Sequence, residues 1–129
     1  MNGWLIFAAL NGLCAILGGA YAAHGAQMAL GDYGRINFEA AAQYQMIHAL
    51  LLLIVTLWGE QRGGLRGALR LAAWAFVAGL LLFPGGLYIL AFTGPSVLGR
   101  IVPLGGMALI FGWLMLAWHG VAEGKSGGR

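Results

Sequence analysis

Four long apolar stretches without a single formal charge constrain this chain more than any other feature. Crossing the hydrocarbon core of a bilayer takes about 20 mostly apolar residues in a helix, and each stretch is close to that length. In lipid the backbone polar groups must be bonded within the segment, and no stretch alternates polar and apolar residues as a barrel strand does. We therefore predict transmembrane helices at about residues 3–23, 40–58, 71–92 and 101–119.

The expected fold is all-α: an integral membrane four-helix transmembrane bundle that forms a single domain over residues 1–129. Composition argues against a soluble alternative. The chain is 60% apolar even without its 23 glycines, and only 9% of its residues are charged, whereas soluble domains carry roughly 25% charged residues. A chain this short buries only about two-thirds of its surface when it folds in water. The lipid bilayer is therefore the expected solvent and partner.

Basic residues are few and lie outside the apolar stretches. The net charge is +3, and no basic stripe with interleaved aromatic residues is present, so no nucleic-acid partner is expected. Four crossings put both termini on one side of the membrane, and basic residues are retained in the cytoplasm during insertion. Both termini are therefore predicted to be cytoplasmic. That side carries Arg62, Arg66, Arg70, Lys125 and Arg129, and the opposite side carries Arg35 and Arg100.

The remaining segments are expected to be short or irregular. Residues 24–39 form the longest predicted connection, with a short surface helix at 26–30 that Gly31 disfavours extending. The first stretch is expected to be retained as a helix, because the residues before it lack the Lys or Arg that opens a secretory signal. Residues 124–129 are expected to form a frayed tail. Cys14, the single cysteine, has no disulfide partner in the chain and is expected to be a small buried side chain.

Polar side chains in the second span are the main candidates for a functional site, because polar groups in lipid are costly and normally face protein or a cavity. Gln45 and His48 share a helix face at a spacing of three residues, as do Tyr44 and His48 at a spacing of four. Topology brings the end of the first span and the middle of the third into the same half of the bilayer. Glu39 and Arg100 both border the interface there and are expected to pair. The candidate cluster comprises His24, Glu39, Tyr44, Gln45, His48, Tyr88 and Arg100.

Proline and glycine interrupt the third and fourth stretches in that same half of the bilayer. A proline within a span leaves an upstream carbonyl unbonded and opens a local distortion. Small residues spaced four apart, such as Ala75 and Gly79, let helix backbones approach closely. The predicted helix-break and close-packing positions are Pro84, Gly85, Gly86, Pro103, Gly105 and Gly106.

Three interpretations of the polar cluster stay open. The first is a network that fixes helix register, with Gln45 and His48 bonded to neighbouring backbone and to Tyr88. The second is a small cavity, open toward the outer face, that binds an ion, a lipid headgroup or a small solute, where His48 is able to carry a proton. The third is ligation of haem or a metal by two histidines, which lacks a third ligand of the Cys or Asp type within the spans.

Four motifs along the chain resemble the signatures of a known family. They are GGAYAAHG at 18–25, YQMIHAL at 44–50, FPGGLY at 83–88 and PLGG at 103–106, which is followed by Gly112-Trp113. In order and coverage these motifs are similar to those of the small bacterial membrane proteins catalogued as domain of unknown function 423. The resemblance implies about four spans and no established biochemical activity.

The family pattern also has departures in this chain. The family typically has Phe-Ser-Gly-Ser-Leu-Tyr where this chain has Pro84 and Gly86 in place of the two serines, and Val102 stands where a threonine is common. A cavity that depended on those hydroxyls would have fewer polar groups in this chain, which favours the interpretation of the cluster as a network that fixes helix register. The residues to which the pattern carries over are His24, Tyr44, Gln45, His48, Gly85, Leu87, Tyr88, Pro103, Gly105 and Gly106.

The function expected from these observations is non-enzymatic. No nucleophile motif, phosphate loop or metal-hydrolase helix occurs in the sequence, so no catalytic residue, cofactor or metal is expected. The protein is expected to be a structural or accessory multi-pass protein of the bacterial inner membrane, within a homo-oligomer or a larger membrane complex. The alternative is a small oligomeric transporter or channel that uses the outer-half pocket around His24, Gln45, His48 and Tyr88.

Overall fold

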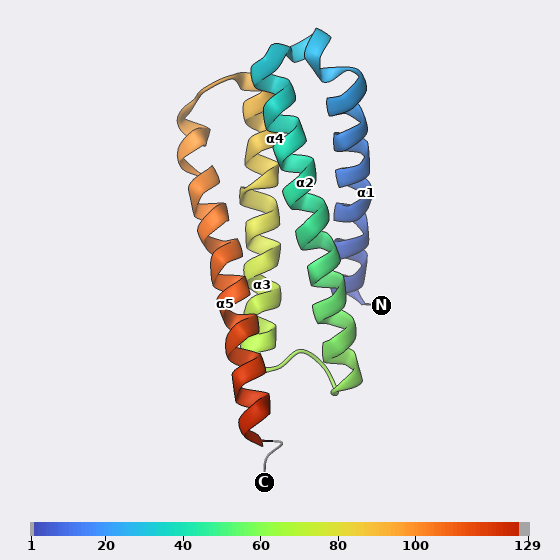
Figure 1. Cartoon of the computed structure of the whole chain (residues 1–129), viewed down its shortest axis with the longest axis vertical. Coiled ribbons are helices and arrows are strands. Elements are labelled where there is room, and N and C mark those ends of the chain that lie inside the picture. Colours follow the sequence, from blue (N-terminus) through green and yellow to red (C-terminus); the bar gives the residue numbers. More distant parts are fainter. Residues whose placement is uncertain (1, 127–129) are drawn as a thin grey trace.

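The structure is a computed structural model that describes residues 2–126. Within these residues it consists of helices joined by short connections, without strands (Figure 1). The elements are α1 (Gly3–His24), α2 (Ala26–Gln61), α3 (Gly67–Leu82), α4 (Pro84–Thr93), the 3-10 helix η1 (Val97–Arg100) and α5 (Val102–Ser126). Four segments are long and apolar enough to cross a membrane, namely α1, α2, α3 with α4, and η1 with α5. The predicted all-α architecture of four membrane-crossing segments is therefore confirmed.

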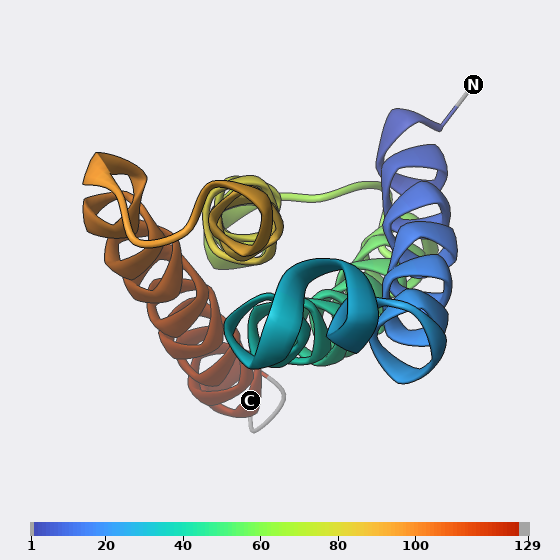
Figure 2. The ribbon, with the colours of Figure 1, turned by 90° about the horizontal axis from the view of Figure 1, so that it is seen from above.

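The helices are arranged around α2. It packs against α1 on one side and against α3 and α4 on the other, while α5 packs mainly on α3. Figure 2 shows α1 and α5 at opposite margins of the bundle, with α2 and the α3–α4 segment between them. Each crossing segment contains an apolar window of 18 residues. In α2 and in the α3–α4 segment 44% of the window's residues are buried, whereas in the outer segments, α1 and η1 with α5, the share is 22%. The outer helices therefore present most of their surface to the bilayer.

The second crossing helix begins earlier than predicted. Gly31 has φ 68° and ψ −170°, a backbone conformation that glycine adopts without the penalty of a Cβ atom, and it separates a short helical turn at 26–30 from the main part of α2. Residues 32–39, predicted as part of a connection, are helical instead. Arg35 and Glu39 lie one turn apart there and form an ion pair of 2.8 Å, which supports the helix outside the apolar window.

The two predicted proline breaks differ in their effect. Pro84 divides the third span, since α3 ends at Leu82 and α4 begins at Pro84, while the amides of Phe83 and Leu87 keep their i,i+4 bonds at 2.8 and 3.0 Å. Pro103 interrupts nothing, because it lies in the first turn of α5, where its missing N–H would have had no partner in the helix. Its prediction as a helix break is corrected on this ground.

Small residues bring α3 and α4 against α5. A Cβ atom at Gly105 would collide with the backbone of Leu82 and Phe83, and one at Gly86 would lie 2.7 Å from Cγ2 of Val102. Glycine at these positions lets the backbones approach where no hydrophobic effect holds helices together. Gly85 and Gly106, by contrast, have only ordinary van der Waals neighbours at 3.7–3.8 Å.

Two further predictions are corrected. Residues 124–126 continue α5 to Ser126 and are not a frayed tail, and residues 127–129 of the predicted tail lie outside the described part of the chain. Cys14 is exposed and not buried; it lines a shallow, open hollow between α1 and α4 together with Tyr88 and Phe92. The buried side of α1 consists of Ala8, Ala15, Gly18 and Ala22.

Candidate functional site

Three polar side chains from three helices form a hydrogen-bonded chain across the bundle. The Tyr88 hydroxyl of α4 donates to Oε1 of Gln45 in α2 at 2.7 Å, and Nε2 of Gln45 donates to Oδ1 of Asn11 in α1 at 3.0 Å. Asn11 in turn donates from Nδ2 to the carbonyl of Phe7 at 2.9 Å. Gln45 is only 7% exposed. Because an unbonded amide in an apolar surrounding costs several kcal/mol, this pairing is what permits Gln45 to be buried.

Local packing positions Tyr88 in this chain of hydrogen bonds. A Cβ atom at Gly18 would lie 2.5 Å from the Tyr88 hydroxyl oxygen, so the absence of a side chain at Gly18 makes room for the phenol. The ring of Phe38 packs against that of Tyr88 with centroids 4.8 Å apart, and the ring of Tyr21 also packs against Phe38, at 4.9 Å. Helices α1, α2 and α4 therefore meet at one aromatic and polar junction.

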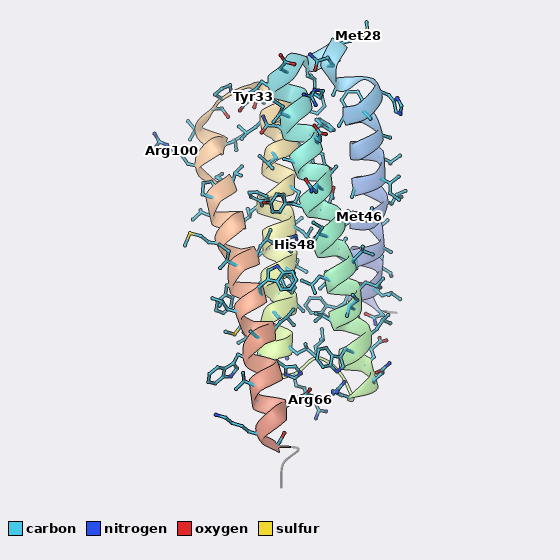
Figure 3. The ribbon with its side chains drawn as sticks, viewed as in Figure 1. Met28, Tyr33, Met46, His48, Arg66 and Arg100 are labelled. Carbon is cyan, nitrogen blue, oxygen red and sulfur yellow. The ribbon has the colours of Figure 1, made fainter. Side chains whose placement is uncertain are left out.

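His48 forms a second polar connection, between α2 and α5 (Figure 3). Its Nδ1 lies 2.8 Å from the carbonyl of Tyr44, and the indole Nε1 of Trp113 lies 3.2 Å from its Nε2. A carbonyl only accepts and an indole N–H only donates. The contacts therefore select the neutral imidazole with the proton on Nδ1 and the lone pair on Nε2. His48 is 5% exposed, and both of its ring nitrogens are used within the protein.

The structure assembles part of the predicted cluster. Gln45, His48 and Tyr88 belong to the two connections just described. The Tyr44 ring is 44% exposed and lies parallel to the His48 ring at 6.2 Å, with its other contact to Phe83. Within the described residues, the Tyr44 hydroxyl forms no hydrogen bond of either connection.

The other three predicted members lie elsewhere. His24 is exposed at the end of α1. The predicted pair of Glu39 and Arg100 does not form, because α2 begins early enough to place Arg35 one turn before Glu39, where it takes the carboxylate. Arg100 ends η1 and points away from the bundle (Figure 3). The predicted outer pocket comprised His24, Gln45, His48 and Tyr88, and of these His24 forms none of the hydrogen bonds described above.

Two members of the network were missed by the sequence interpretation. Asn11 is an amide in the middle of an apolar stretch, and a polar group at such a depth already indicates a bonding partner. The sequence interpretation assigned Trp113 no polar role, since a tryptophan within a span carries no signal that separates packing from donation. Within residues 2–126 no group of three His, Cys, Asp or Glu side chains lies close enough together to hold a metal ion.

A separate contact joins α2 and α5 at the end of the bundle that carries the α2–α3 connection. Arg62 pairs with Glu123 at 3.0 Å and lies 4.9 Å from the Trp58 ring, while Nε2 of His119 lies 3.5 Å from the same carboxylate. His119 was expected where the last helix ends. It lies within α5 because that helix runs two turns further.

The hydrogen-bond partners within the network determine what it can do chemically. Each of its bonds joins neutral groups, a donor to an acceptor, and together they connect α1, α2, α4 and α5. Such bonds are worth about 0.6 kcal/mol each on average in a membrane protein. They fix how the helices are rotated against one another, which is the work of a structural network.

Comparison with known proteins is consistent with this description. The family described as "Protein of unknown function (DUF423)" matches residues 18–106. The "UPF0382 membrane protein YwdK" of Bacillus subtilis is 40% identical over 90% of this chain and 94% of its own length. The "UPF0382 membrane protein SAB0533" of Staphylococcus aureus is 41% identical over 90% of this chain and 93% of its own. No solved structure matches the chain significantly. The chain belongs to the DUF423 family of membrane proteins, whose activity is unknown.

Proposed function

We propose that the protein is a non-enzymatic structural or accessory component of the bacterial inner membrane. The observation that carries this proposal is the pairing within the network: Gln45 bonds Asn11 and Tyr88, and both nitrogens of His48 have partners. A site that binds or converts a substrate needs polar groups directed at the ligand. Here the buried side chains of Gln45 and His48 are directed at partners within the protein, which favours a packed scaffold.

The proposal includes an orientation with both termini in the cytoplasm. It is supported by where the basic residues lie. Arg66 lies at the end of the bundle where α1 begins and α5 finishes, and Arg100 lies at the opposite end (Figure 3). Basic side chains are retained on the cytoplasmic side during insertion, so the end that carries the α2–α3 connection is the cytoplasmic one.

The proposal also includes assembly with further subunits, as a homo-oligomer or within a larger membrane complex. Support comes from the uneven burial of the helices, since α1 and α5 are buried over only 22% of their most apolar windows. A protein that acts as an accessory subunit needs such free helix surface. Lipid covers the same surface when no partner is bound.

Native mass spectrometry of the protein released gently from its own membrane tests the proposal. We expect a fixed stoichiometry, either of copies of this chain or of this chain with another membrane protein. A second experiment, which could contradict the proposal, uses vesicles reconstituted with the purified protein. Movement of an ion or solute that exceeds the rate in empty vesicles, and that is lost in a Gln45→Ala, His48→Ala double variant, would overturn the structural role.

A further inference from the structure

A groove of about 900 Å³ lies between α1 and α3, with α2 and the α2–α3 connection forming its floor. Figure 2 shows α1 set apart from α3, and α2 is the helix that contacts both. The volume is in the range of sites that hold small organic ligands. None of the polar side chains of the network lines the groove, and the groove lies at the other end of the bundle from the predicted pocket.

The mouth of the groove is polar and carries one charge of each sign. Asn2, Glu60 and Arg70 line it, from the beginning of α1, the last turn of α2 and the first turn of α3. The Asn2 amide donates to Oε1 of Glu60. Within residues 2–126 neither Glu60 nor Arg70 forms an ion pair. Both charges are therefore available to a ligand at the mouth.

Deeper in the groove the lining becomes apolar. Trp4 follows Asn2 by two residues and Trp74 follows Arg70 by four, with their rings in edge contact at 4.8 Å, and Phe7 and Val77 come three residues after them. Tryptophan is enriched where the headgroup layer meets the acyl chains. The groove therefore passes from charged groups to a tryptophan pair to apolar side chains, in the order of the layers of the surrounding bilayer.

We propose that this groove binds one zwitterionic glycerophospholipid with a primary ammonium headgroup, of the phosphatidylethanolamine type. Arg70 binds the phosphate by charge-assisted hydrogen bonds, and Glu60 binds the ammonium through the carboxylate oxygen that Asn2 does not use. An acyl chain lies along Trp4 and Phe7 on one side and Val77 on the other. Basic pockets between transmembrane helices commonly hold anionic headgroups, but the carboxylate of Glu60 at the mouth favours a headgroup that brings a positive charge. The inference rests on membrane insertion and not on the proposed structural role.

Competition between two lipids tests the inference. The purified, delipidated full chain in detergent is mixed with equal amounts of phosphatidylethanolamine and phosphatidylglycerol that carry identical acyl chains, and bound lipid is measured by native mass spectrometry. We expect one bound lipid per chain, retained severalfold more often as phosphatidylethanolamine. Equal retention, preference for phosphatidylglycerol, or absence of bound lipid would overturn the inference.

Three variants locate the site. Arg70→Gln is expected to weaken retention of both lipids about tenfold, the loss that accompanies removal of one charge-assisted hydrogen bond. Glu60→Gln keeps an acceptor for Asn2 and is expected to abolish the preference between the lipids while leaving phosphatidylglycerol bound. Arg100→Gln, at the opposite end of the bundle, is the control and is expected to change neither. If Arg70→Gln behaves like Arg100→Gln, the groove is not the site. These substitutions are at exposed positions and are expected to change lipid retention without changing helix assembly. Failure of the lipid inference therefore leaves the proposed structural role unaffected.

Discussion

The indole Nε1 of Trp113 in α5 donates a hydrogen bond to Nε2 of the buried His48 in α2, over 3.2 Å. Backbone contact between α2 and α5 is sparse compared with that of α3 and α5, so side chains carry much of the connection between these helices. His48 has a second bond, to the Tyr44 carbonyl, that holds the ring in place. The Trp113 bond therefore joins α5 directly to α2, in addition to the packing of α5 on α3.

Trp113→Phe tests that bond. The substitution keeps an aromatic ring but removes the donor, which leaves Nε2 of His48 without a partner, and we expect the free energy of unfolding to fall by about 1 kcal/mol. Unfolding in mixed micelles of increasing SDS content measures it. Trp118→Phe is the matched control, because Trp118 lies on the same helix and is 64% exposed. Equal effects of the two substitutions would contradict the role assigned to Trp113.

Gln45 and Tyr88 should be energetically coupled. Tyr88→Phe removes the donor to Oε1 of Gln45, and Gln45→Leu removes the acceptor together with the bond to Asn11. In a double-mutant cycle we expect a coupling of about 0.5–1.5 kcal/mol in the free energy of unfolding. Tyr33→Phe with Gln45→Leu is the control cycle, since Tyr33 is 42% exposed and lies outside the network. A coupling within error of that control would show that the hydroxyl contributes nothing.

Gly18→Ala should disturb the same junction from the other side. The new methyl group would lie 2.5 Å from the Tyr88 hydroxyl oxygen, and overpacking of this kind costs about 1–3 kcal/mol. The loss should shrink in a Tyr88→Phe background, where the clashing oxygen is absent. Gly12→Ala in the same helix meets nothing within 4 Å, so we expect unchanged or slightly higher stability there. The measurement is the same SDS unfolding curve, and a Gly12→Ala loss as large as that of Gly18→Ala would refute the argument.

The sequence predicted the membrane-crossing segments well because lipid imposes a length and an apolar composition that can be read directly. It predicted the ends of the helices less well. An apolar stretch ends at the first charged residue, whereas a helix can continue through charged residues. Residues 32–39 remain helical, and the ion pair of Arg35 and Glu39 one turn apart supports the helix beyond the apolar window. Gly31, interpreted as limiting the short helix, has the positive φ of a kink.

For the site, spacing within α2 placed Gln45 and His48 on one face, and the structure buries both. Their partners on other helices were not predictable in the same way. Helix α1 is apolar on all sides, so its sequence does not reveal which face turns toward α2, and hence whether Asn11 points inward. The direction of Trp113 depends likewise on the rotation of α5. Contacts between helices require the packing geometry, which a single sequence does not contain.

The proposed orientation makes a further prediction that one pair of substitutions tests. Ser96 precedes η1 at one end of the bundle, and Ser126 ends α5 at the other. In a Cys14→Ala background, which removes the single native thiol at an exposed position, Ser96→Cys should react with a membrane-impermeant maleimide in intact spheroplasts. Ser126→Cys should react only after the membrane is opened, because the five basic residues of its side hold that end in the cytoplasm. The reverse pattern would invert the topology, and it would also place the Arg70 groove in the outer leaflet.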